Sequence, residues 1–165
     1  MEKLQRFTTN LWFDKEAEEA AQFYTSIFKN SSIGSKSYYG EAGKETHQMP
    51  AGTVMTIAFT LDGQPFTGLN GGPIFKFNEA ISFIVNCDSK EELDHYWERL
   101  TEDSDPATHI CGWLKDKFGV SWQVIPRKMG EMITSNPEAG QRVMAEVMKM
   151  KKLDWDVLQR AHKNS

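Results

Sequence analysis

The chain carries an internal repeat in which a strand pattern, a helix pattern and further strand patterns occur twice, from about residue 4 to 71 and from about 79 to 126. In the first half, Leu4 to Phe13 alternates between two faces and precedes an amphipathic helix pattern that follows Asp14. In the second half, Ala80 to Cys87 alternates as well, and Ser89 precedes the helix pattern. A repeat of this period indicates two structural units of one kind, each covering its sheet with a helix. We therefore predict an α+β protein built from two tandem βαβββ modules.

The other strands are marked by alternation and by turn residues. In the first module we expect strands at Ser35–Tyr39, Thr53–Leu61 and Gln64–Asn70. A hairpin at Asp62-Gly63 should join the last two of these strands. In the second module we expect strands at Ala107–Trp113 and Val120–Ile125. In the latter, Trp122 and Gln123 point to opposite faces, because side chains alternate along a strand.

Residues beyond the repeat are predicted to be helical. Pro137 suits the first turn of a helix, and two apolar stripes at helical spacing follow it. Stripes of methionine and aliphatic residues are most often packing surfaces. The predicted organisation is a first module over residues 1–72, a second module over 73–126 and C-terminal helices over 127–165, within one structural domain.

Composition excludes several classes of function. A net charge of -4 and a pI near 5.6 give no basic surface for nucleic acid. No apolar run reaches the roughly 18 residues of a membrane span, and the N-terminal residues lack the apolar centre of a signal peptide. Cys87 and Cys111 form no CxxC pair. We expect a cytoplasmic protein that acts on neither nucleic acid nor membranes.

Five segments, spread in order over nearly the whole chain, carry a family resemblance: LWFDKEAEEAAQFYTSIF, VMTIAFTLDGQPFTGLNGGP, EAISFIVNC, GWLKDKFGVSWQVIP and QRVMAEVMKMKKLD. With the repeat, they resemble the vicinal oxygen chelate superfamily, also called the glyoxalase/bleomycin-resistance superfamily. The segments are similar to its PhnB-like branch, some members of which are labelled 3-demethylubiquinone-9 3-methyltransferase. The resemblance implies curled mixed sheets around a cleft, and a homodimer, since this superfamily commonly builds or completes clefts across subunits.

The resemblance also implies four positions for a divalent metal, and this chain departs from the pattern at them. Metal-dependent members hold the ion on His, Glu or Gln side chains from the first and last strands of each module. The corresponding positions here are Thr8, Asn70, Ser82 and Gln123. All four side chains are neutral, whereas divalent cations prefer carboxylate, imidazole or thiolate ligands. We expect no cofactor, and a divalent metal is disfavoured although not excluded by the residues.

Several residues are candidates for chemistry. His109 lies two residues from Cys111 and could act as a base, while His47 lies in the long polar loop from Gly40 to Gly52. Glu79 is a carboxylate near the start of the second module. Each also has a plain structural interpretation, as a core histidine, a loop histidine or a solvated charge respectively.

Three functions stay open from the sequence. The first is a small-molecule binding protein of the antibiotic-binding or sequestering kind, whose cleft is lined by aromatic and polar side chains: Thr8, Asn10, Trp12, Asn70, Ser82, Trp113 and Gln123, with Trp122 either in the cleft or under the helices. The second is an enzyme, a lyase, dioxygenase or transferase. The only glycine cluster, Leu69 to Pro73, does not open a helix, and so does not support the methyltransferase label. The third is a structural or partner-binding dimer.

Overall fold

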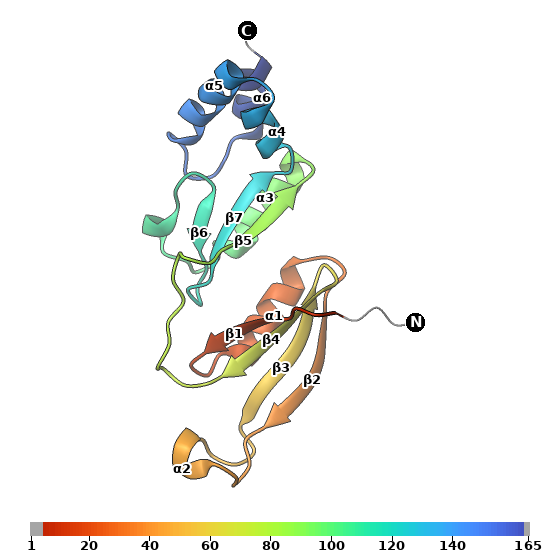
Figure 1. The fold of residues 1–165 in the computed structure, drawn as a ribbon, viewed down its shortest axis with the longest axis vertical. Coiled ribbons are helices and arrows are strands. Elements are labelled where there is room, and N and C mark those ends of the chain that lie inside the picture. The colour runs from red at the N-terminus through yellow and green to blue at the C-terminus, as the bar shows by residue number, and fades with distance from the viewer. Residues whose placement is uncertain (1–4, 164–165) are drawn as a thin grey trace. The chain divides into compact units, whose positions relative to one another are not determined.

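The computed structural model describes residues 5–163, and Leu4, the predicted first residue of the first strand, lies outside them. The described chain divides into two compact units, one ending at Phe77 and the other beginning at Asn78. Each unit carries its own sheet and its own helices (Figure 1).

Unit 1, the described chain up to Phe77, has the predicted βαβββ order. Its elements are β1 (Thr9–Phe13), α1 (Ala17–Ile27), β2 (Ser32–Tyr38), the short α2 (Lys44–His47), β3 (Val54–Leu61) and β4 (Gln64–Asn70). The strand order in the sheet is β1-β4-β3-β2. β1 and β4 are parallel, and the other neighbours are antiparallel. The β3–β4 hairpin turns at Asp62-Gly63, as expected, with φ of 46° and 75°.

The core of unit 1 lies between α1 and one face of the sheet. The alternation in β1 buries Leu11 and Phe13, while Asn10 on the opposite face is exposed. Tyr24 of α1 is fully buried and contributes to this core. Helix and sheet approach closely at Gly68, where an added Cβ would come within 3.1 Å of the Ala17 side chain. Burial of this face is the main stabilising term for a unit of this size.

Unit 2, the described chain from Asn78, has a smaller sheet than the repeat predicts. It contains β5 (Phe83–Cys87), α3 (Lys90–Leu100), a 3-10 turn η1 (Pro106–Thr108), β6 (Trp113–Lys115) and β7 (Ser121–Pro126). The strand order is β5-β7-β6, with β5 and β7 parallel and β6 and β7 antiparallel. The Ser89 hydroxyl caps α3 by accepting a hydrogen bond from the amide of Glu92, as its place before the helix indicates.

The predicted strand over Ala107–Trp113 is wrong for most of its length. Pro106 opens the 3-10 turn, and only Ile110 forms a bridge, to Trp113. The chain reverses at Cys111 and Gly112, whose φ angles of 52° and 84° lie outside the β region. The hairpin made by this reversal leaves β6 as the short edge strand of the sheet.

The C-terminal helices belong to unit 2. They are α4 (Met129–Thr134), α5 (Pro137–Val147) and α6 (Trp155–Lys163), and α5 packs against the other two (Figure 1). The side-chain oxygen of Asn136 caps α5, and Pro137 occupies its first turn, as predicted. The helical stripes are packing surfaces, since Val143 and Leu158 are fully buried.

These elements confirm the predicted fold class: an α+β protein with two open sheets of mixed strands and a C-terminal helical extension, consistent with two βαβββ modules. Within residues 5–163, no helix is both long and apolar enough to cross a membrane.

Candidate functional site

The turn from Asp116 to Gly119 fixes the geometry of the sheet in unit 2. The Asp116 carboxyl group is buried, and its Oδ1 accepts hydrogen bonds from the amides of Phe118 at 2.9 Å and Val120 at 3.0 Å. Its Oδ2 accepts a hydrogen bond from Trp122 Nε1 at 2.8 Å. These three bonds hold the turn closed and the Trp122 indole on the helix-facing side, where it is 3% exposed. Trp122 is therefore a core residue, and the open face of the sheet belongs to its neighbours.

Two of the four predicted metal positions meet on that open face. Gln123 Nε2 donates a hydrogen bond to Ser82 Oγ over 2.9 Å. Trp113 lies directly opposite Gln123 across the β6–β7 ladder, and Ile84 lies opposite it across the β5–β7 ladder. Side chains directly opposite one another share a face, so Trp113, Gln123 and the half-exposed Ile84 form one surface.

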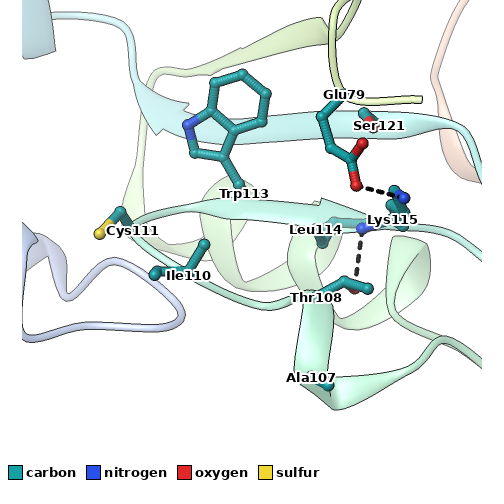
Figure 2. A pocket seen from close by; sticks show the side chains of 9 residues that line it. All are labelled: Glu79, Ala107, Thr108, Ile110, Cys111, Trp113, Leu114, Lys115 and Ser121. Atoms are coloured by element: carbon teal, nitrogen blue, oxygen red, sulfur yellow. Dashed lines mark hydrogen bonds and ion pairs between the residues drawn. The ribbon is translucent and has the colours of Figure 1, made fainter.

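Beside this surface, at the edge strand β6, lies a pocket of about 510 Å³ (Figure 2). Its walls come from the η1 segment, the Cys111 reversal, β6, the start of β7 and the chain before β5. The lining residues are Glu79, Ala107, Thr108, Ile110, Cys111, Trp113, Leu114, Lys115 and Ser121. A pocket of this size, mainly apolar with a few polar groups, is typical of small-molecule sites.

The polar end of the pocket is an ion pair. The Glu79 carboxylate and the Lys115 ammonium group bind each other, as the dashed line in Figure 2 marks. The hydrogen bond from Lys115 holds the pKa of Glu79 below its ordinary value, so Glu79 is ionised at neutral pH. The backbone of Lys115 is fixed in turn, because its amide donates to Thr108 Oγ1 over 3.1 Å. The pair therefore presents a donor and an acceptor to the pocket with no net charge.

Ser121 lies across the ladder from Lys115. The residue is 2% exposed, and its hydroxyl oxygen has no hydrogen-bond partner among residues 5–163. A buried hydroxyl without a partner costs about 1–3 kcal/mol. A ligand or a water molecule that bonds to it would recover part of that cost.

His109 and Cys111 do not form a base and nucleophile pair. The strand that would have placed them in parallel is absent, and only Cys111 lines the pocket. His109 Nε2 and the Ser104 hydroxyl are hydrogen-bonded over 2.8 Å, and the imidazole packs edge-on against Trp97 of α3. Burial, and secondarily the charge of Lys151, lowers the pKa of His109. His109 is a packed, uncharged residue at neutral pH.

His47 belongs to unit 1 and is tied into its own loop. Its Nδ1 accepts a hydrogen bond from the amide of Met49 at 2.9 Å, and its Nε2 lies 3.2 Å from the carbonyl oxygen of Ala42. The ring also packs on Tyr39, with ring centroids 4.6 Å apart. Both nitrogens therefore have local partners.

The other predicted site residues of unit 1 lie on or near β1 and β4. Thr8 and Asn10 are exposed, and Trp12 is half-buried. Trp12 Nε1 donates to the Gly72 carbonyl oxygen over 2.9 Å, and any Cβ at Gly71 would overlap the indole. The glycine cluster after β4 thus makes room for Trp12.

Asn70 lies on the helix-facing side instead of the expected open side of β4. It pairs with Phe13 in the ladder and is 4% exposed, because the alternation of β4 turns Phe66, Gly68 and Asn70 inward together. Its Oδ1 accepts from the amide of Ala17 at 2.9 Å, and its Nδ2 donates to the Val54 carbonyl oxygen at 3.1 Å. Asn70 therefore joins α1 to the sheet.

The residues at the predicted metal positions do not fit a divalent ion. Ser82 and Gln123 offer only neutral oxygens and bond to each other, and Asn70 is committed to backbone groups. Across the described part of the chain, no three His, Cys, Asp or Glu side chains are grouped so that they could hold a metal. Hard and borderline divalent cations need charged or imidazole ligands that this set lacks.

Six of the nine lining residues were not singled out from the sequence: Ala107, Thr108, Ile110, Leu114, Lys115 and Ser121. The alternation of β7 places Ser121 on the same face as Gln123, which is the one available signal. The part played by Ile110 depends on the reversal at Cys111, for which the sequence shows no common turn dipeptide.

The two sheets and their residues indicate the class of protein to which the chain belongs. Comparison with known proteins gives the same class. The model of the 3-demethylubiquinone-9 3-methyltransferase family matches residues 5–125, which includes both modules. The predicted resemblance to the PhnB-like branch of the vicinal oxygen chelate superfamily is thereby confirmed. The chain belongs to the 3-demethylubiquinone-9 3-methyltransferase family.

Several solved structures are similar to this chain. A PhnB protein from Bacillus cereus that carries the same family name is 40% identical, with 72% of this chain and 97% of that chain covered and a TM-score of 0.60. Protein PA1353 from Pseudomonas aeruginosa is 20% identical, with 73% and 95% covered and a TM-score of 0.54. The fosfomycin resistance protein FosX from Listeria monocytogenes is 18% identical, with 79% and 96% covered and a TM-score of 0.48. Comparison with curated proteins found no significant match.

Proposed function

We propose that this chain binds a small, largely apolar molecule without net charge in the pocket beside Trp113. The observation that carries the proposal is the pocket itself, with its volume of about 510 Å³ and its apolar walls at Ile110, Trp113 and Leu114. Trp113 is half-buried and supplies a flat apolar surface at which an aromatic or aliphatic ring can pack.

The polar groups favour an uncharged ligand. Glu79 and Lys115 already neutralise each other, so a charged ligand would have to break this pair or leave its own charge unpaired. The Ser121 hydroxyl can donate or accept one hydrogen bond. A carbonyl, amide or hydroxyl group on the ligand matches both features.

Binding in this proposal uses no divalent metal. The neutral pair Ser82 and Gln123 offers too little ligand charge, so chelators should leave affinity unchanged.

Methyl transfer is not part of the proposal, although the family carries that description. After β4 the glycines at 71 and 72 lead into irregular chain, and the next regular element is β5 rather than a helix. A helix N-terminus following a glycine-rich turn is the usual way to bind the anionic or polar end of a nucleotide-like cofactor. The alternative of an enzyme with His109 as its base has less support, because that ring is packed and hydrogen-bonded away from the pocket.

A titration followed by amide NMR tests the proposal with three probes that share one ring: benzamide, benzoate and benzylammonium. Benzamide has about nine non-hydrogen atoms, and at roughly 0.5 kcal/mol per atom its Kd should be near 1 mM. We expect shifts concentrated at residues 107–115 and 121, with benzamide binding tightest. The same shifts are expected in the presence of EDTA.

A matched pair of variants controls for a general loss of aromatic surface. Trp113→Ala removes a pocket wall, whereas Trp155→Ala removes a half-buried tryptophan of α6 that lines no part of the pocket. Only the former should abolish the benzamide shifts. Absence of binding by all three probes, or shifts confined to residues far from β6, would contradict the proposed function.

A further inference from the structure

The connection between α5 and α6, residues 148–154, lies against the reversal that forms one wall of the pocket. The amide of Cys111 donates to the Met150 carbonyl oxygen, and the amide of Gly112 donates to the Lys151 carbonyl oxygen, both over 2.8 Å. Cys111 Sγ lies 4.0 Å from Met148 Sδ. Two consecutive backbone bonds and a sulfur contact thus hold the turn from one side.

The turn itself is conformationally demanding. Ile110 to Trp113 form a two-residue hairpin in which both central residues have positive φ, 52° at Cys111 and 84° at Gly112. Such turns normally use Gly, which has no Cβ, or Asn or Asp, whose short polar side chains tolerate the left-handed region, at the first of these positions, whereas other residues are strained there. The strained conformation persists only where surrounding contacts determine it.

Leu153 supplies a further contact of this kind. It is 1% exposed, and a Cβ added at Gly112 would lie 3.1 Å from its Cδ1. The connection is also held to α3, since Lys152 pairs with Asp94. The connection, residues 148–154, therefore links α3 to the turn, and we call it the brace.

The brace lies outside the part of the chain that matches the family model, which ends at residue 125. The turn that it holds carries Ile110, Cys111 and Trp113, three of the lining residues of the pocket. We propose that the α5–α6 connection is a positioning element of the ligand site, which sets the pocket wall and hence which ligands fit. This inference rests on the proposed function, because the turn matters for ligands only as part of the pocket.

Two buried leucines of the extension give a matched test. Leu153 contacts the turn, whereas Leu158 is equally buried in α6. In Leu153→Ala, alkylation of Cys111 by iodoacetamide should accelerate by about fivefold or more, since the turn opens more often. Its benzamide Kd should rise by about threefold or more. In Leu158→Ala, measured at a temperature of equal folded fraction, both quantities should stay within about twofold of the parent.

An exposed variant covers the case in which Leu153→Ala does not fold. Met148 is 67% exposed, so Met148→Ala should fold normally and still uncover Cys111 Sγ, raising the alkylation rate by about threefold. Equal effects of the two leucine variants, or an unchanged alkylation rate in Met148→Ala, would overturn the inference. The alkylation rates need no ligand, so a failure of benzamide to bind the parent protein would count against the proposed function and not against the brace.

Discussion

Replacing Asp116 by Ala should destabilise unit 2 severely. The substitution removes three hydrogen bonds to one buried carboxyl group, from the amides of Phe118 and Val120 and from Trp122 Nε1. Hydrogen bonds to a charged group contribute about 1.5–3 kcal/mol each, and water can reach some of the freed donors, so we expect a loss of about 4–6 kcal/mol. That is about half of the free energy of unfolding of an ordinary domain, which is about 5–15 kcal/mol. Urea unfolding followed by tryptophan fluorescence measures the loss.

Asp116→Asn separates the contribution of the two backbone hydrogen bonds from that of the Trp122 hydrogen bond. Its amide oxygen can keep both backbone bonds, but its NH2 group would face Trp122 Nε1, a donor opposing a donor, at a cost of about 2 kcal/mol. In a Trp122→Phe background that conflict disappears, so the same substitution should cost less than about 1 kcal/mol. An equal cost of Asp116→Asn in both backgrounds would refute the assignment of the Trp122 bond.

Three further predictions concern titratable groups. Burial raises the pKa of Cys87 from 9.0 to about 12, so its stabilising contribution is complete below pH 9.0 and is lost as the pH rises toward 12. Relative to Cys87→Ala, the parent should therefore lose up to roughly 4 kcal/mol over that range in alkaline urea titrations. The pKa of His109 is lowered mainly by burial, so its contribution is present above pH 6.5 and is lost as the pH falls through the lowered pKa. His109→Gln should accordingly show a weaker acid-side loss of thermal stability, and an unchanged loss would contradict the packed, neutral assignment. Glu79→Gln leaves the positive charge of Lys115 without its charged partner. The ratio of the benzoate Kd to the benzamide Kd, measured by NMR titration, should therefore fall by about threefold or more. An unchanged ratio would argue against a pocket without net charge.

Much of the fold could be read from the sequence because its determinants are local. Alternation identified β1, β3, β4, β5 and β7, and Asp62-Gly63 and Ser89 marked a hairpin and a helix start. The strand expected at 107–113 failed because its course depends on a tertiary contact. The backbone bonds from Cys111 and Gly112 to residues 150 and 151 stabilise a reversal that the local sequence does not indicate.

The site was predictable only to the extent that it depends on strand alternation. That pattern turned Gln123 away from Trp122 and toward the face where it meets Ser82. The same reasoning failed at Asn70, because the phase of β4 is fixed by packing of Phe66 and Gly68 against α1 and not by the end of the strand. The pocket lies beside Gln123 and not over it, since its walls come from the loop that precedes β6. The cleft that the resemblance implies, with the curled mixed sheets around it, stays a prediction.

The most direct test of the proposed function is to locate a bound probe. Crystals soaked with para-bromobenzamide and measured at the bromine absorption edge reveal the position of the bromine atom. We predict one anomalous peak among Ile110, Trp113 and Leu114, with the amide group toward Ser121 and the Glu79–Lys115 pair. A bromine peak elsewhere with this pocket empty, under conditions where the NMR titration shows binding, would contradict it.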